Sequence, residues 1–166
     1  MTAPTDAMLE ALAGQVAAQL MALGHGLVTA ESCTGGWIGK VCTDLPGSSR
    51  WFLGGAIVYG NGAKSELLGV DSSILAAHGA VSEPAARAMA SGALQRVAGD
   101  VSVAVTGIAG PDGGTPDKPV GMVWFAWGRR IEGQVVVESA VEYFRGDREA
   151  VRRQTVERAL RGLLGS

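Results

Sequence analysis

The chain has 166 residues, a formal net charge of −2 and 47% hydrophobic residues, which suits a single domain over residues 1–166. No apolar run approaches the ~20 residues that a membrane-spanning helix needs, and the scattered basic residues argue against a nucleic-acid binder. With no secretory signal at the N-terminus, the two cysteines, Cys33 and Cys42, predict a cytoplasmic protein with free thiols and without a zinc site.

The first half of the chain alternates helical and strand patterns. Apolar residues at helical spacing from Asp6 to Leu23 predict a helix that stops at Gly24. Next come a predicted strand over 27–30, a helix over about 35–44, a loop over 45–49 and a strand over 51–59. The apolar character of this last strand predicts that it is buried, and its paired glycines suggest a bulge.

The second half continues the alternation. The pattern predicts short helices over 61–68 and 72–78, a helix from Ser82 to about Val97, strands over 101–105, 120–127 and 135–141, and a last helix from Asp147 to about Leu164. Such a mixture predicts an α/β fold, with a mixed sheet between layers of helices. The pattern leaves the strand order open.

The most informative segment is Ala30–Gly36, a strand-to-helix turn that carries Glu31, Ser32 and Thr34 before two glycines. Glycines allow a ligand to approach the backbone, and the following helix presents N–H groups that favour an anion or an oxyanion. The structural alternative is a helix N-cap, with one of the two hydroxyls as the capping group.

A second segment combines serines with a lysine. Ser48 and Ser49 follow a Pro-Gly turn, and Tyr59 precedes Lys64 by five residues. A serine nucleophile needs a base, and neither of the two histidines is well placed, so a Ser-Lys arrangement is the next candidate. The alternatives are a solvated helix lysine and a pair of turn serines.

Two further segments have binding potential. Thr106–Gly114 is a glycine-rich loop that follows a predicted strand, where α/β folds collect ligands, although a plain crossover loop is the alternative. Its Asp112 has no second carboxylate nearby, so no metal is predicted. Arg145 and Arg148 flank the start of the last helix and suit a phosphate, whereas a solvated helix face is the simpler interpretation for Arg152 and Arg153.

Taken together and in this order, these segments resemble the CinA C-terminal domain family of nicotinamide-nucleotide amidases. The resembling stretches are 29–36, 44–52, 59–64, 79–84, 106–114 with 119–121, and 146–153. The resemblance implies a three-layer α/β/α fold and a homodimer that needs no metal or cofactor. It also implies an amidohydrolase that converts nicotinamide mononucleotide to nicotinate mononucleotide and ammonia in pyridine-nucleotide recycling.

The resemblance further implies roles for individual residues. Ser49 is expected as the nucleophile and Lys64 as its base, with Tyr59 and Ser32 assisting, while Ser32 and Ser48 remain competitors for the attack. Backbone N–H groups at 34–36 are expected to stabilise the oxyanion. The expected substrate-binding residues are Glu31, Thr34, Gly35, Gly36, Ser48, Asn61, Thr106, Gly107, Gly110, Arg145 and Arg148.

Two departures from the family pattern are visible. Gly60 and Gly62 stand where larger polar residues are common, and the nucleotide-pyrophosphatase-like domain of longer CinA proteins does not precede this unit, which predicts a stand-alone amidase. Two alternative functions stay open: a non-catalytic binding module associated with competence and recombination, and an amidase that acts on a different nucleotide amide.

Overall fold

The computed structural model of the protein describes residues 2–165, which form one five-stranded sheet with helices on both faces. The strands are β1 (Leu27–Glu31), β2 (Phe52–Ile57), β3 (Val101–Gly107), β4 (Met122–Ile131) and β5 (Gln134–Tyr143). Their order across the sheet is β2-β1-β3-β4-β5, in which β1 is parallel to β2 and β3 while β4 and β5 are antiparallel neighbours.

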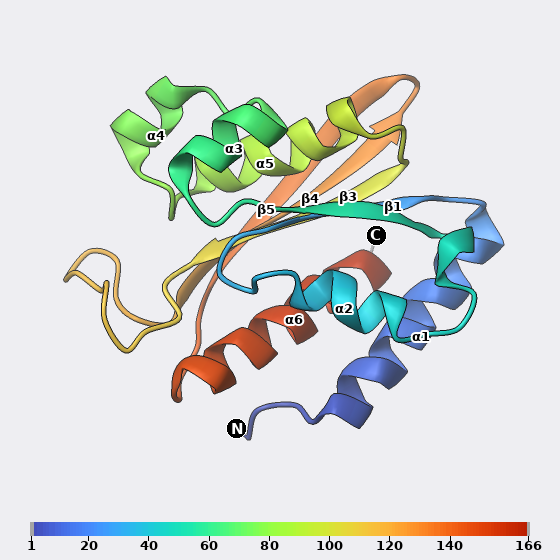
Figure 1. The fold of residues 1–166 in the computed structure, drawn as a ribbon, viewed down its shortest axis with the longest axis horizontal. Helices are drawn as coiled ribbons and strands as arrows, with labels where there is room; N and C mark the ends of the chain where they lie inside the picture. Colours follow the sequence, from blue (N-terminus) through green and yellow to red (C-terminus); the bar gives the residue numbers. More distant parts are fainter. Residues whose placement is uncertain (1, 166) are drawn as a thin grey trace.

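Six α-helices and one short 3₁₀ turn complete the described fold. They are α1 (Asp6–Leu23), α2 (Trp37–Thr43), the 3₁₀ turn Ser48–Arg50, α3 (Asn61–Leu68), α4 (Ser72–His78), α5 (Glu83–Arg96) and α6 (Arg148–Leu164). Figure 1 shows α1, α2 and α6 below the sheet and α3, α4 and α5 above it. The predicted three-layer α/β/α fold with a mixed sheet is therefore confirmed.

The helix ends follow the predicted capping residues. Ser82 accepts a hydrogen bond from the backbone N–H of Ala85 at the start of α5, and Asp147 accepts one from Ala150 at the start of α6. Gly24 ends α1 in the left-handed conformation at φ 66°, which glycine adopts without steric cost. These boundaries were predictable because a cap depends on only three or four neighbouring residues.

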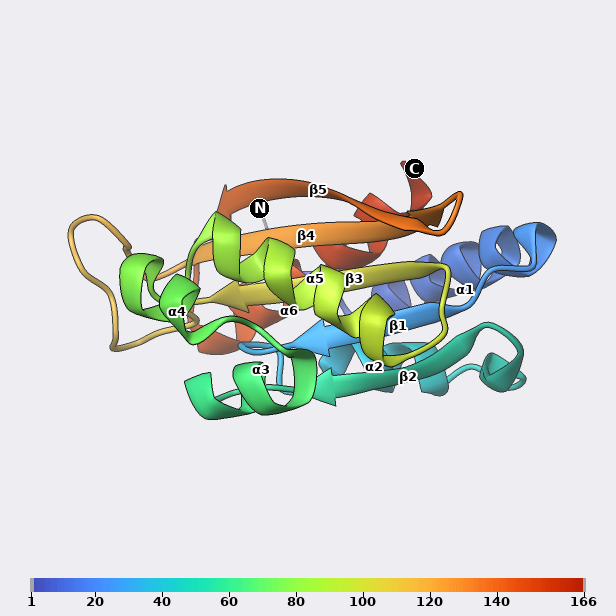
Figure 2. The same cartoon turned by 90° about the horizontal axis from the view of Figure 1, so that it is seen from above.

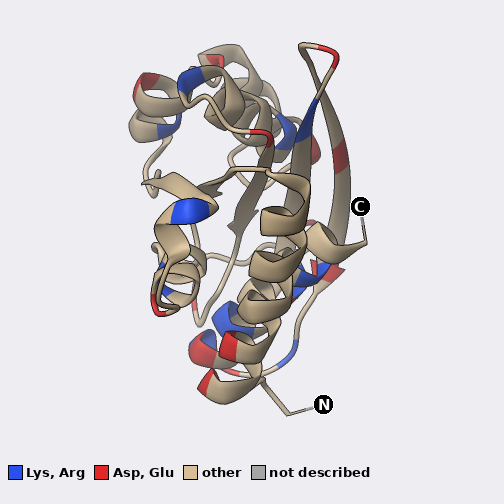
Figure 3. Ribbon diagram, turned by 90° about the vertical axis from the view of Figure 1, so that its right-hand side faces the viewer, with Lys and Arg blue, Asp and Glu red and all other residues tan. Residues whose placement is uncertain are grey.

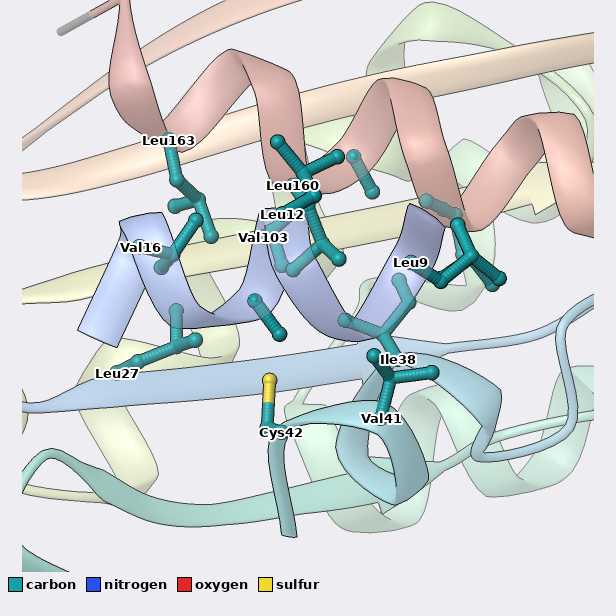
Figure 4. Packing of buried hydrophobic residues seen from close by; sticks show 14 of the residues in the cluster. Leu9, Leu12, Val16, Leu27, Ile38, Val41, Cys42, Val103, Leu160 and Leu163 are labelled. Atoms are coloured by element: carbon teal, nitrogen blue, oxygen red, sulfur yellow. The ribbon is translucent and has the colours of Figure 1, made fainter. Parts of the chain in front are cut away.

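The larger part of the core lies below the sheet, between β1, β3 and the three helices α1, α2 and α6. Figure 4 shows the side chains of these elements converging on one apolar layer. Its labelled members are Leu9, Leu12, Val16, Leu27, Ile38, Val41, Cys42, Val103, Leu160 and Leu163. A second cluster packs α5 and α3 against the opposite face of the sheet.

Strand β2 differs from its prediction because it lies at the edge of the sheet. Its residues alternate between half-buried and exposed, and Leu53 and Ile57 are 45% and 56% exposed. The pairing with β1 slips by one residue between Phe52 and Gly54, which confirms an irregularity next to the glycine pair. The prediction of a buried strand is wrong because an apolar run does not reveal whether a neighbour covers it.

The chain direction brings four connections to one end of the sheet. The segments that follow β1, β2 and β3 lie there with the segment that leads from β5 into α6, as Figure 2 shows at its left-hand side. The carboxyl ends of parallel strands are where α/β folds commonly place their ligands. This end of the sheet is therefore the place to look for a site.

Figure 3 shows basic and acidic residues interspersed over the visible ribbon. None of the helices in residues 2–165 combines the length and the apolar character of a membrane span.

Candidate active site

Lys64 is the centre of the candidate site. It lies on α3 just beyond β2, and it is only 1% exposed, so the alternative of a solvated helix lysine is excluded. Its Nζ lies 3.2 Å from Ser32 Oγ and donates hydrogen bonds to the carbonyl oxygens of Val58 at 2.8 Å and Tyr59 at 3.2 Å. The parallel pairing of β1 with β2 produces this contact, because it places the ends of the two strands side by side.

Burial changes the acid–base character of Lys64. Removal from water disfavours the charged form and lowers the pKa of its amine below the ordinary value of 10.5. Within residues 2–165 no carboxylate forms an ion pair with Lys64 that would offset this effect. A buried lysine without a counter-ion is a common way in which proteins make a neutral amine available as a base.

The turn after β1 is organised by Glu31, which is 2% exposed. One carboxylate oxygen accepts from Thr34 Oγ1 at 2.7 Å and from the N–H of Ile38 at 2.9 Å, and the other accepts from the N–H of Gly39 at 2.8 Å. Glu31 thus occupies the N-terminal end of α2, which was expected to bind an external anion. Substrate contacts were predicted for Glu31 and Thr34, and in this structure their side chains bond each other inside the protein.

Within the same turn, several N–H groups remain available to a ligand. Among the hydrogen bonds of residues 2–165, the N–H groups of Cys33, Thr34 and Gly36 have no protein acceptor. The N–H of Gly35 instead bonds to the carbonyl of Ser32 at 3.0 Å, so its expected role as an oxyanion donor is corrected. An N–H group directly after a nucleophilic serine is a frequent oxyanion donor.

The structure does not bring Ser49 to Lys64 within this chain. Ser49 lies exposed in the 3₁₀ turn before β2, whereas Lys64 follows β2, and the six residues of the strand separate them. At about 3.3 Å per residue the strand alone spans roughly 16 Å. Figures 1 and 2 show the two segments at opposite ends of β2. Within one chain the expected partners Ser49 and Lys64 therefore lie apart, and Ser48 shares the position of Ser49.

Tyr59 contacts Lys64 through its backbone and not through its phenol. The carbonyl accepts from Lys64, while the side chain is 59% exposed and its hydroxyl accepts from Arg148 Nη2 at 2.8 Å. Arg148 also donates to the carbonyl of Gly110 at 2.7 Å. Arg148 thereby links the end of β2 to the glycine-rich loop at the edge of the candidate site.

The other predicted residues are spread around this centre. Thr106 is 1% exposed and donates to the carbonyl of Ala80 at 2.8 Å, so its hydroxyl first of all anchors the segment before α5. Gly107 ends β3 beside Val123. Asn61 opens α3 on the surface, and exposed Arg145 lines a hollow with α6 and the end of β5, away from Tyr59.

The cysteine beside Ser32 is not suited to nucleophilic attack. The Cys33 side chain is buried, and burial raises the pKa of its thiol to about 12, so it remains protonated at neutral pH. Among residues 2–165 there is no group of three or more His, Cys, Asp or Glu side chains arranged to hold a metal ion.

Two features of the site were missed from the sequence. The first is the pair of carbonyls of Val58 and Tyr59 that accept from Lys64, because the type of a residue does not reveal where its backbone carbonyl points. Arg152 donates to the carbonyls of Cys33 at 3.1 Å and Thr34 at 2.8 Å. Its spacing of four residues from Arg148, which puts both on one face of α6, was the available signal.

Comparisons with known proteins identify the family of this chain. The sequence matches the CinA C-terminal domain over residues 9–166. It is 50% identical to the nicotinamide-nucleotide amidohydrolase PncC of Escherichia coli K12 over 159 residues, which cover 96% of this chain and 94% of that protein. It is 53% identical over 136 residues to a CinA-like protein of Akkermansia muciniphila, covering 82% of this chain and 32% of that longer protein.

A solved structure shows the same fold. The competence damage-inducible protein A of Klebsiella pneumoniae superposes with a TM-score of 0.90 at 38% identity, covering 95% of this chain and 96% of that chain. The domain match, the level of identity and the shared architecture lead to one conclusion: the chain belongs to the CinA C-terminal domain family.

Proposed function

We propose that this protein is an amidohydrolase that deamidates nicotinamide mononucleotide to nicotinate mononucleotide and ammonia, with Ser32 as nucleophile and Lys64 as base. The observation that carries this proposal is the 3.2 Å contact between Ser32 Oγ and the buried Lys64 Nζ. Similarity to the PncC amidohydrolase supports the reaction and the substrate. A binding module without catalysis would have no need for a buried, unpaired lysine next to a serine.

The hydrogen bonds of Lys64 suit a neutral amine. A neutral amine has two N–H groups and one lone pair, and two carbonyls, those of Val58 and Tyr59, accept from this nitrogen. The lone pair is then directed at the third partner, the hydroxyl of Ser32. In this state Ser32 donates its proton to Lys64 as its oxygen attacks the carboxamide carbon.

The turn after Ser32 suits the next step. Attack converts the carboxamide into a tetrahedral oxyanion, and the available N–H groups of Cys33, Thr34 and Gly36 are the donors that we assign to it. Protonated Lys64 then gives its proton to the departing amine, and ammonia leaves. Water, activated by the same lysine, hydrolyses the acyl-enzyme and restores Ser32.

The remaining contacts with substrate are proposals of the same kind. We assign the phosphate to Arg148, because it lies at the junction of Tyr59 and the loop at Gly110. Asn61 and Gly107 remain proposed lining residues. Arg145 is a weaker proposal, since it lines a separate hollow.

We also propose a cytoplasmic homodimer. Cys33 and Cys42 are free and buried, as is usual for proteins of a reducing compartment. Exposed Leu53 and Ile57 on the edge strand β2 support self-association, because edge strands with apolar side chains are commonly covered by a partner.

The decisive test of the function is ammonia release from nicotinamide mononucleotide, compared with the riboside and with free nicotinamide. We expect turnover of the mononucleotide and a much lower kcat/KM for the two substrates that lack the phosphate, because their binding loses a charge-assisted contact. Faster ammonia release from a different nucleotide amide than from the mononucleotide would show that the proposed substrate is wrong. No release from any of them would favour the binding module.

Activity is expected to depend on pH through Lys64. The amine must be neutral to accept the serine proton, so kcat/KM is expected to rise with pH and to level off below 10.5, because burial lowers the pKa. Between the lowered pKa and 10.5 the amine of Lys64 is neutral in the folded protein but protonated in the unfolded chain. The free energy of unfolding is therefore expected to rise with pH over that range. A profile of kcat/KM against pH measures the midpoint. A rise centred on the ordinary lysine value would contradict the assignment.

A further inference from the structure

Arg152 makes a two-pronged contact with the turn that carries Ser32. Its Nε donates to the carbonyl of Cys33 at 3.1 Å and its Nη2 to the carbonyl of Thr34 at 2.8 Å. The guanidinium also lies over the ring of Trp37, with its Cζ 5.0 Å from the ring centroid. Two hydrogen bonds and one ring contact define the plane of the guanidinium, so the two carbonyls are held by a rigid group.

The guanidinium of Arg152 has no carboxylate partner within residues 2–165. Three other arginines of α6 form ion pairs with carboxylates, namely Arg153, Arg158 and Arg161. Within residues 2–165, Arg152 forms no such pair, and its guanidinium contacts the two carbonyls and the Trp37 ring. Partial burial of a guanidinium without a carboxylate partner costs free energy, which raises the question of how its positive charge affects the turn that it contacts.

Peptide geometry carries the effect of Arg152 to the serine. The C=O and N–H of a trans peptide point in opposite directions, so a Cys33 carbonyl that faces Arg152 directs the Thr34 N–H away from it. The peptide between Thr34 and Gly35 shows the same arrangement. Its carbonyl accepts from Arg152, and its N–H, which points away from Arg152, bonds to the carbonyl of Ser32. The Thr34 N–H, which has no acceptor in residues 2–165, therefore points toward the Ser32 side of the turn.

A positive charge behind these peptides also strengthens their donors. A hydrogen bond to a charged donor polarises the carbonyl, and polarisation passes through the peptide to its N–H group. The gain is largest when the N–H faces a full negative charge, which at this site arises only in the tetrahedral intermediate.

We propose that Arg152 is a positioning residue of this active site, which orients and polarises the Cys33–Thr34 peptide so that its N–H stabilises the oxyanion at Ser32. The inference rests on the proposed amidohydrolase function. It assigns no contact between Arg152 and the substrate, and thereby differs from a role in binding the phosphate.

Kinetics of Arg152→Gln and Arg152→Lys test the proposal against Arg153→Gln. We expect Arg152→Gln to lower kcat and kcat/KM for nicotinamide mononucleotide equally, by about 10²-fold, with KM unchanged, because only the transition state is affected. Arg152→Lys should lose less, since an ammonium keeps the charge but not the two-pronged geometry. Arg153→Gln removes the neighbouring arginine and its contact with Trp37, also 5.0 Å, and should behave like the parent.

The opposite kinetic result would overturn the inference. Arg152 also borders a hollow of about 360 Å³ with Lys40 and the turn at Gly35. If Arg152 bound the substrate phosphate through this hollow, Arg152→Gln would raise KM and leave kcat unchanged. A parental kcat in Arg152→Gln would likewise refute the proposal. Addition of guanidinium chloride at millimolar concentration to Arg152→Ala should restore part of the lost kcat if the missing cation is the cause.

A measurement without turnover separates this inference from the proposed function. In ¹H–¹⁵N spectra of the folded variants, Arg152→Gln should shift the amide signals of Thr34 and Gly35, and Arg153→Gln should leave them in place. If the parent released no ammonia, the proposed function would fail, while these spectra would still decide whether Arg152 controls the turn. Unchanged Thr34 and Gly35 signals in Arg152→Gln would contradict the inference.

Discussion

Replacement of Ser32 by alanine is expected to lower kcat for ammonia release from nicotinamide mononucleotide by at least about 10⁴-fold, as the loss of a serine nucleophile does in other hydrolases. The reason is the 3.2 Å contact between Ser32 Oγ and Lys64 Nζ. The substitution removes one hydroxyl from a residue that is 8% exposed and leaves the turn after β1 otherwise intact. Ammonia release under substrate saturation measures the effect, and circular dichroism confirms that the variant folds.

Lys64→Met should cause a loss of similar size. Methionine keeps the length and the apolar stem that the buried site requires, but it has no basic nitrogen. Because a nucleophile and its base act as one unit, the double variant with Ser32→Ala should be no slower than either single variant. Losses that multiplied in the double variant would show that the two residues act independently, and would contradict the proposed pair.

Ser49→Ala is the matched control, since it also removes one serine hydroxyl. Ser49 lies exposed before β2, at the far end of the strand from Lys64, so the variant should retain activity close to the parent's. Loss of activity in Ser49→Ala together with full activity in Ser32→Ala would reverse the assignment of the nucleophile.

The fold was largely predictable because its helices are locally encoded. The predicted bounds of the first helix, Asp6 to Leu23, are those observed, and the predicted caps Ser82 and Asp147 are confirmed by their hydrogen bonds. Strand burial was less predictable. The edge position of β2 depends on which strands pair with β1, and that choice is made by contacts far apart in the sequence.

The site was predictable in its residue types but not in its pairing. The motif at Ala30–Gly36 and the lysine of the Tyr59–Lys64 segment do come together, although 32 positions separate Ser32 from Lys64. The choice of Ser49 as partner came from family resemblance, and a sequence without strand order offers no check on distance. The parallel register of Glu31 with Ile57 supplies that check, because it fixes which residues meet at the end of the sheet.

The role of Glu31 was also hidden, since a carboxylate in a glycine-containing turn beside a serine was predicted to bind substrate. In the structure the Glu31 carboxylate takes the place of a cap. The N-cap residue of α2 is Gly36, which has no side chain to cap the helix, and Glu31 on the preceding strand accepts hydrogen bonds from the first N–H groups of α2. The backbone at Gly36 has φ 95°, a conformation that favours glycine. This conformation helps the chain to change direction between the end of β1 and the start of α2, over residues 32–36. The glycines that indicated a ligand site in the sequence therefore also have a structural role, because they let the start of α2 come within hydrogen-bond distance of Glu31.

Glu31→Gln is expected to lower the free energy of unfolding by about 3 kcal/mol, because the substitution weakens charge-assisted hydrogen bonds and leaves a buried donor unpaired. A carboxylate presents two acceptors, one to Thr34 and Ile38 and the other to Gly39. The amide of glutamine presents only one, and its NH₂ group must face either the N–H of Ile38 or that of Gly39. Urea denaturation should show a lower midpoint with an unchanged m-value, since the native compactness is retained.

The same substitution should lower activity beyond its effect on stability, because Glu31 holds the turn that follows Ser32 through the hydroxyl of Thr34. The kcat of folded Glu31→Gln, measured well below its unfolding midpoint, is therefore expected to fall while KM changes little. Glu10→Gln, a substitution of the same kind on the exposed face of α1, should stay within about 0.5 kcal/mol of the parent and keep its kcat. If Glu31→Gln were as stable and as active as Glu10→Gln, the internal carboxylate would be neither the cap of α2 nor a support of the turn, and the N-terminal end of this helix would again be open to an external anion.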